Sequence, residues 1–80
     1  MPQPGDFKTL DGKPLTHGMR VWDYDLRPCM VDLEGRIDYE TNQNDGSVAM
    51  WFDTHYENGR RNTMSHDRVW VLHPFDRVPA

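Results

Sequence analysis

Four histidines and one cysteine are the side chains of this 80-residue chain most able to do chemistry, but their spacing indicates no reactive site. No two histidines stand four residues apart and no Cys-x-x-Cys pair occurs, so the spacings typical of metal sites are missing. His66 and Asp67 could form half of a catalytic pair, and Cys29 could be a nucleophile. A lone cysteine that follows a proline and has no identifiable base is more often a packing residue. We therefore expect a protein that is not an enzyme and that uses no metal or other cofactor.

Three tryptophans are stronger candidates for binding a partner. Side chains alternate between the two faces of a strand, and each tryptophan has the parity opposite to the aliphatic residues beside it. In a small barrel whose first and last strands are neighbours, Trp22 and Trp70 would share one outer surface. Tryptophan and tyrosine are enriched at binding hot spots, so this surface is a candidate protein interface. Its predicted members are Trp22, Tyr24, Trp70 and Leu72.

Two other interpretations of the tryptophans stay open. Bulges could shift the parity so that one or two tryptophans fill the core. Alternatively, the segment from Phe7 to Leu10 could fold over Trp22 and Trp70 and cover them.

An acidic stripe is the second candidate contact. It follows one face of the predicted strand at 31–40, is interrupted only by Arg36, and consists of Asp32, Glu34, Asp38 and Glu40. Such a stripe could meet a basic partner surface or imitate a phosphate backbone. It is also typical of a solvated face whose charges prevent edge-to-edge strand pairing.

Nucleic-acid binding is a less favoured alternative, because the chain has a net charge of −4 and phosphate contacts depend on clustered basic residues. A local basic patch could still matter more than the total. In this alternative an aromatic ring stacks on bases while arginines contact phosphates. The candidate residues are Trp51, Tyr56, Arg60, Arg61 and Arg68.

Short strands must position all of these side chains. Six glycines and six prolines divide the chain, and no apolar helical pattern persists for three turns. Residues 1–6 are expected to form an extended, poorly ordered tail, and Ser65 could cap a single helical turn. Gly35 indicates a bulge or bend in the longest strand, and Asn58-Gly59 indicates a tight hairpin. The predicted strands cover residues 7–10, 19–24, 31–40, 47–56, 60–64 and 69–73.

This order of elements predicts an all-β fold, a five-stranded SH3-like barrel with a short extended N-terminal segment. An open OB-type barrel is the main competitor, but it usually carries a helix where the Asn58-Gly59 turn stands. The predicted divisions are an extended arm at 1–15, the barrel at 16–74 and a C-terminal tail at 75–80.

Cysteine content and hydropathy bear on the setting of the protein. A single cysteine does not fit a secreted disulfide scaffold and favours a reducing, cytoplasmic location. No apolar run approaches the roughly 18 residues needed to span a bilayer, so no membrane association is expected.

Two stretches carry a family resemblance. The first is Gly18–Pro28, with the sequence GMRVWDYDLRP. The second is Trp51-Phe52-Asp53, which is followed by a polar hairpin and Arg68-Val69. Together they resemble small uncharacterised accessory proteins of tailed phages of actinobacteria, mycobacteriophages in particular. The resemblance covers about residues 11–74, and the family pattern has glycine where this chain has Cys29. It implies a small accessory protein made in the infected cell, some relatives of which bind host proteins. It implies no catalytic or ligand-binding residues.

Three functions from different classes follow from these observations. The favoured one is a protein-interaction module, directed at a host protein if the chain is phage-encoded. The others are a nucleic-acid-binding barrel and a self-associating module that forms a homodimer through its outer aromatic face.

Overall fold

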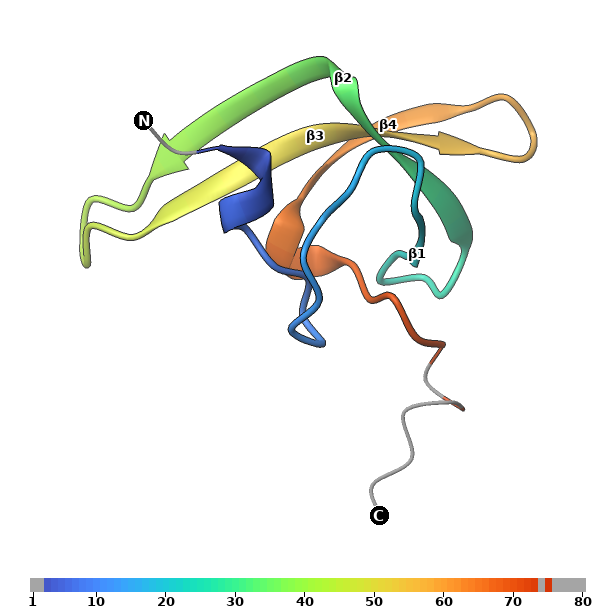
Figure 1. Cartoon of the computed structure of the whole chain (residues 1–80), viewed down its shortest axis with the longest axis horizontal. Coiled ribbons are helices and arrows are strands. Elements are labelled where there is room, and N and C mark those ends of the chain that lie inside the picture. Colours follow the sequence, from blue (N-terminus) through green and yellow to red (C-terminus); the bar gives the residue numbers. More distant parts are fainter. Residues whose placement is uncertain (1–2, 74, 76–80) are drawn as a thin grey trace.

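A single antiparallel sheet of four strands, curled into half a barrel, is the framework of the protein in the computed structural model (Figure 1). The structure describes residues 3–73 and 75. The strands follow chain order across the sheet and are β1 (Arg20–Trp22), β2 (Pro28–Thr41), β3 (Val48–Tyr56) and β4 (Arg61–Ser65). Two single turns of 3-10 helix complete the elements, η1 (Pro4–Asp6) and η2 (His66–Arg68). In the described part of the chain, no helix has the length and apolar character required to cross a membrane.

The long strand β2 bends where the sequence predicts a bulge. Its pairing with β3 shifts register between Asp32 and Ile37, and Gly35 lies in that interval. The Gly35 backbone N–H donates to Asp32 Oδ1 at 2.8 Å, and a Cβ at this position would lie 2.9 Å from Asp32 Oδ2. Only glycine lets the backbone approach the Asp32 carboxylate this closely, so the predicted bend at Gly35 is confirmed.

A tight hairpin at Asn58-Gly59 joins β3 to β4, as predicted. Gly59 has a positive φ of 84°, and its N–H donates to the carbonyl of Tyr56 at 3.0 Å. The side-chain oxygen of Asn58 accepts the Arg60 backbone N–H at 3.0 Å. This local bonding projects the arginines that follow the turn away from the core.

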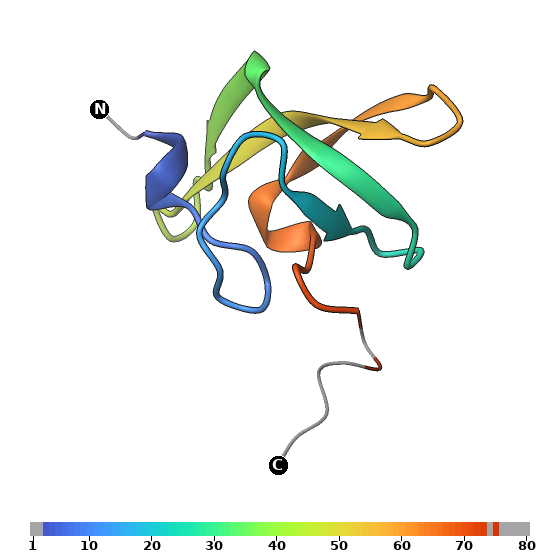
Figure 2. The same cartoon turned by 45° about the vertical axis from the view of Figure 1, so that its right-hand side comes forward.

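The curled sheet is closed toward β1 by one residue pair instead of a fifth strand. Trp70 bridges Trp22 in antiparallel fashion, and Figure 2 shows β1 beside the chain that follows η2. The predicted strand at 69–73 does not continue past this bridge because the backbone N–H groups of Val71 and Leu72 donate to the Asp11 carboxylate. The predicted strand at 7–10 is likewise reduced to one bridge, between Lys8 and Pro14.

The core lies on the concave side of the sheet and confirms the predicted strand parity. Val21, Phe52 and Val69 are fully buried, while the tryptophan next to each is only partly buried. Eight apolar residues form this core, namely Phe7, Leu15, Val21, Cys29, Val31, Met50, Phe52 and Val69. Two of them, Phe7 and Leu15, belong to the N-terminal segment, which lies under the curled sheet in Figure 1.

The ends of the chain differ in part from the predicted tails. Pro4–Asp6 forms the turn η1 instead of an extended segment, because the N–H groups of Asp6 and Phe7 donate to backbone carbonyls three residues earlier. Residues 1–2, Pro74 and 76–80 lie outside the described residues. The single turn predicted after Ser65 is present as η2, although the Ser65 hydroxyl donates to the Asp67 carboxylate at 2.6 Å and does not cap the turn.

Candidate functional site

The Trp22–Trp70 bridge is the centre of the candidate interface. The N–H of Trp22 donates to the carbonyl of Trp70 at 2.7 Å, and the N–H of Trp70 donates to the carbonyl of Trp22 at 3.0 Å. Residues directly opposite each other in an antiparallel pair project their side chains from the same face. The two indoles therefore lie on one outer surface, opposite in parity to the buried Val21 and Val69.

Further rings lie beside each of the two indoles. The ring of Tyr24 lies 5.2 Å from that of Trp70, and the ring of His73 lies 4.7 Å from that of Trp22, in an edge-on arrangement at 83°. Phe75 follows at 5.0 Å from His73. These centroid separations are those of favourable aromatic pairs. We call this patch the aromatic surface; its members are Trp22, Tyr24, Trp70, His73 and Phe75.

Two arginines lie over the aromatic surface. The guanidinium of Arg20 is 5.1 Å from the centroid of Trp22, and that of Arg68 is 5.6 Å from the centroid of Tyr24. Both distances are within the range of cation–π attraction. Among the described residues neither arginine forms an ion pair with a carboxylate. The surface therefore combines exposed rings, with Phe75 83% exposed and Tyr24 56% exposed, and positive charge.

The sequence identified part of this surface. It predicted Trp22, Tyr24 and Trp70, and it also predicted Leu72, which is exposed. His73 and Phe75 were not predicted, because strand parity placed His73 on the inner face. That parity applies only while the strand continues, and the strand geometry ends at Trp70.

Asp11 holds the chain that carries Trp70 in place. Its carboxylate accepts the backbone N–H of Val71 at 3.0 Å and that of Leu72 at 3.0 Å, and the Leu10 N–H donates to the Val69 carbonyl at 2.9 Å. Burial raises the pKa of Asp11, but hydrogen bonds from the Thr9 hydroxyl and from these two N–H groups outweigh burial and hold the pKa below its usual value. Backbone and carboxylate hydrogen bonds from the N-terminal segment thus hold residues 69–72 in position. The Phe7 ring contacts the rings of Tyr39 and His66. These contacts place it away from Trp22 and Trp70, which it was considered to cover.

The predicted acidic stripe is divided by the bend in β2. On one side, Asp32 accepts from His55 at 2.9 Å, and His17 lies 3.6 Å from Glu34. On the other side, Arg36 pairs with Asp38 at 2.8 Å. The hydrogen bond from His55 is the largest effect that holds the pKa of Asp32 below its usual value, with further help from the backbone N–H groups of Glu34 and Gly35. Glu40 lies beyond Asp38 on the same strand and is exposed.

The residues predicted for nucleic-acid binding fall into two places. Trp51 and Arg68 line a hollow of about 270 Å³ together with the acidic residues Glu40 and Asp67. The indole N–H of Trp51 is buried and has no hydrogen-bond partner among the described residues. Tyr56, Arg60 and Arg61 line a different hollow at the opposite end of β3. The five residues predicted to contact nucleic acid therefore line two separate hollows and do not form one groove for stacked bases.

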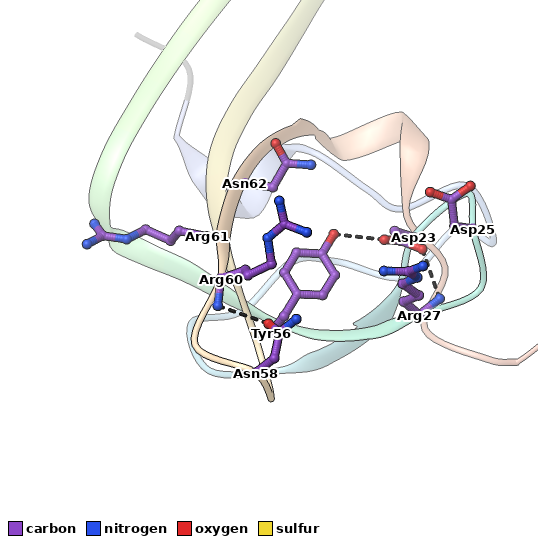
Figure 3. A pocket seen from close by; sticks show the side chains of 8 residues that line it. All are labelled: Asp23, Asp25, Arg27, Tyr56, Asn58, Arg60, Arg61 and Asn62. Atoms are coloured by element: carbon purple, nitrogen blue, oxygen red, sulfur yellow. Dashed lines mark hydrogen bonds between the residues drawn. The ribbon is translucent and has the colours of Figure 1, made fainter.

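The hollow at Tyr56 lies between the loop from β1 to β2 and the β3–β4 hairpin (Figure 3). It has a volume of about 260 Å³ and contains Arg27, which the sequence did not single out. The Tyr56 hydroxyl donates to Asp23 Oδ2 at 2.8 Å. Burial and this hydrogen bond to a carboxylate raise the pKa of Tyr56 to about 12, so its hydroxyl stays protonated at neutral pH.

The side chains first considered for catalysis have other contacts. Burial, followed by the nearby charge of Asp23, raises the pKa of the Cys29 thiol to about 11, which makes the nucleophilic thiolate scarce at neutral pH. His66 Nδ1 lies 2.7 Å from the Lys8 carbonyl, whereas Asp67 accepts from Ser65. Within residues 3–73 and 75, no three His, Cys, Asp or Glu side chains are arranged to hold a metal ion.

Comparisons with protein-family models, with curated proteins and with solved structures found no match.

Proposed function

We propose that this chain is a non-catalytic protein-interaction module that binds an acidic segment of a partner protein with its aromatic surface. The observation that carries the proposal is the gathering of five rings, in two contact groups, on either side of the Trp22–Trp70 bridge. Arg20 and Arg68 lie over these rings, and neither arginine has a carboxylate partner among the described residues. Aromatic rings and arginine are the side chains most enriched at binding hot spots.

Charge complementarity selects an acidic partner. The whole chain has a net charge of −4, yet the two charged groups over the aromatic surface are both positive. A basic patch attracts acidic segments of a partner protein. This argues against a homodimer through the same face, since Arg20 and Arg68 would meet their own copies there.

The fold that we propose is an SH3-like barrel. Its support is the order of a first strand, a long bent strand, a hairpin, one 3-10 turn and a return to the first strand through the Trp22–Trp70 bridge. The resemblance of Gly18–Pro28 to phage accessory proteins supports an origin in an actinobacterial phage and a cytoplasmic partner encoded by the host.

The test is capture of partners from an actinobacterial lysate by the tagged full-length chain, compared between variants. Tyr24→Ser and Phe75→Ser remove strongly exposed rings, and Val48→Ser removes an exposed apolar side chain at the far end of β3 as a matched control. Arg20→Glu reverses a charge on the surface, and Lys13→Glu makes the same change in the exposed N-terminal segment.

We expect one host protein that survives nuclease, is retained by Val48→Ser and Lys13→Glu, and is lost with Tyr24→Ser, Phe75→Ser and Arg20→Glu. Equal capture by all five variants would overturn the proposal. Nuclease-sensitive capture would favour nucleic-acid binding instead. A concentration-dependent mass of the pure protein that disappears with Tyr24→Ser would favour self-association.

A further inference from the structure

The hollow between the β1–β2 loop and the β3–β4 hairpin has features that the proposed protein interface does not use. Its lining combines three arginines, two aspartates, two asparagines and a tyrosine: Asp23, Asp25, Arg27, Tyr56, Asn58, Arg60, Arg61 and Asn62. Its volume of about 260 Å³ is below the range of roughly 300–1,000 Å³ typical of sites for drug-sized ligands. A single small charged group fits this size better than a large molecule does.

Local hydrogen bonds set the loop that carries Arg27. Asp23 Oδ1 accepts the Arg27 backbone N–H at 2.9 Å, and the Leu26 N–H donates to the Asp23 carbonyl at 2.9 Å. Leu26 has a positive φ of 62°, a conformation that L-residues other than glycine, asparagine and aspartate rarely adopt. The loop is thus held in a costly conformation that brings Arg27 to the rim of the hollow.

Hydrogen-bond donors outnumber acceptors in this hollow. The three arginine side chains form no ion pair with a carboxylate among the described residues. The side-chain oxygens of Asn58 and Asn62 accept backbone N–H groups, which leaves their amide N–H groups available. Both oxygens of Asp23 are already occupied, by the Arg27 N–H and the Tyr56 hydroxyl. The lining thus carries three arginine charges against the two carboxylates of Asp23 and Asp25.

We propose that this hollow binds a phosphate group. Arginine guanidinium groups match the oxygens of phosphate in planar, charge-assisted pairs, and the free asparagine amides add neutral donors. In Figure 3, Arg27 and Arg60 lie on two sides of the Tyr56 ring, whereas Arg61 extends away from it. Arg27 and Arg60 are therefore the contacting residues, and Arg61 contributes only its charge.

The two neighbouring arginines provide a matched pair of variants. Arg60→Ala removes a contacting guanidinium, and Arg61→Ala removes the same charge one residue away. We expect Arg60→Ala to weaken phosphate binding about tenfold, as the loss of one charge-assisted hydrogen bond predicts, and Arg61→Ala to have a clearly smaller effect. Asp25→Asn should tighten binding, because it removes one negative charge from the lining of the hollow without changing the size of the side chain.

The experiment is an NMR titration of the ¹⁵N-labelled full-length chain with inorganic phosphate, with chloride exchanged so that ionic strength stays constant. Saturable shifts of the Arg27 and Arg60 Nε–H signals and of the Asn58 amide are the expected result. A second arm uses a single-stranded oligonucleotide. Tighter binding of the oligonucleotide with the same shifts would assign the site to a nucleic-acid backbone, and equal or weaker binding would assign it to free phosphate.

Three results would overturn the proposal: shifts that do not saturate, equal weakening by Arg60→Ala and Arg61→Ala, or weaker binding by Asp25→Asn. The last would show that Asp25 supports the binding site and does not repel the ligand. Because Tyr24 and Phe75 do not line this hollow, Tyr24→Ser and Phe75→Ser should leave phosphate binding unchanged. Failure of this site is thus distinguishable from failure of the aromatic surface.

Discussion

The aromatic surface and the acidic stripe are both predicted from strand alternation, but the structure preserves only the first as one surface. The aromatic surface is assembled from two segments far apart in the chain, which meet at the Trp22–Trp70 bridge. The acidic stripe lies within one strand, yet the bend at Gly35 divides it into two parts. Alternation along a single strand is therefore a weaker guide to a surface than a pairing between strands.

The partners of the charged side chains separate the two regions further. Asp32, Glu34 and Asp38 each have a histidine or arginine within ion-pair distance. Arg20 and Arg68 have no carboxylate partner among the described residues and lie over aromatic rings instead. A partner would thus find, among the described residues, two unpaired arginines beside exposed rings on the aromatic surface, whereas three carboxylates of the stripe already have a nearby side-chain partner, and for this reason we place the interface on the former.

The largest expected effect comes from detaching the aromatic surface from the N-terminal segment. Asp11→Ala removes the acceptor for the Val71 and Leu72 N–H groups, and we expect a loss of about 1.5 kcal/mol in the free energy of unfolding, because the site is partly exposed. The tryptophan fluorescence should change with it. Asp45→Ala is the control, since the side-chain hydrogen bonds of that carboxylate within the described residues are local, to Ser47. Chemical denaturation that gives equal losses for both variants would contradict the fastening role of Asp11.

The same contact predicts a pH dependence. The pKa of Asp11 is lower in the folded chain than in the unfolded one, so its stabilisation is complete above the ordinary pKa of aspartate, about 3.9, and is lost as the pH falls through the lowered value. The stabilities of the wild-type chain and of Asp11→Ala should therefore converge in acid. A difference that stays constant from pH 7 to below pH 3 would be inconsistent with this linkage.

A smaller effect is expected at the bend that divides the stripe. Gly35→Ala would bring a Cβ within 2.9 Å of Asp32 Oδ2, so the carboxylate must move away from the Gly35 and Glu34 N–H groups. We expect a loss of about 1 kcal/mol, at the low end for overpacking because a side chain and not the backbone must yield. Gly5→Ala, where an added Cβ meets nothing within 4 Å, is the control for the loss of a glycine. Thermal unfolding of the two variants makes the comparison, and equal midpoints would show that Asp32 yields at no cost.

The smallest effect concerns the charge state of the stripe. Because a hydrogen bond from His55 contributes most to the lowered pKa of Asp32, His55→Ala should raise that pKa toward its ordinary value. The group is exposed, so we expect a clear change in the carboxyl titration seen by ¹³C NMR and little change in stability. Asp45, whose pKa is lowered by Ser47, should titrate unchanged in the same variant. An unaltered titration of Asp32 would show that the backbone N–H groups of Glu34 and Gly35 are sufficient.

Local chemistry allowed the sequence alone to determine several elements of this protein. Alternating apolar residues predicted the main strands, Gly35 predicted the bend, and Asn58-Gly59 predicted the hairpin. Each of these depends on residues close together in the chain, where side-chain alternation and the φ values open to glycine are decisive. Alternation also predicted that the tryptophans face away from the aliphatic residues beside them, although burial of one or two of them in the core stayed open; the structure leaves all three partly buried.

Only the tertiary structure decided which of these side chains meet. The sequence did not indicate that Asp11 would take the N–H groups of Val71 and Leu72, which ends the last strand at Trp70 and lets His73 join the aromatic surface. Nor did it indicate that Arg27 would lie across from Arg60 at one hollow, since their loops are separated along the chain by β2 and β3. Such contacts form because the curling of the sheet brings distant loops together. The spacing of residues along the chain does not predict which loops will meet.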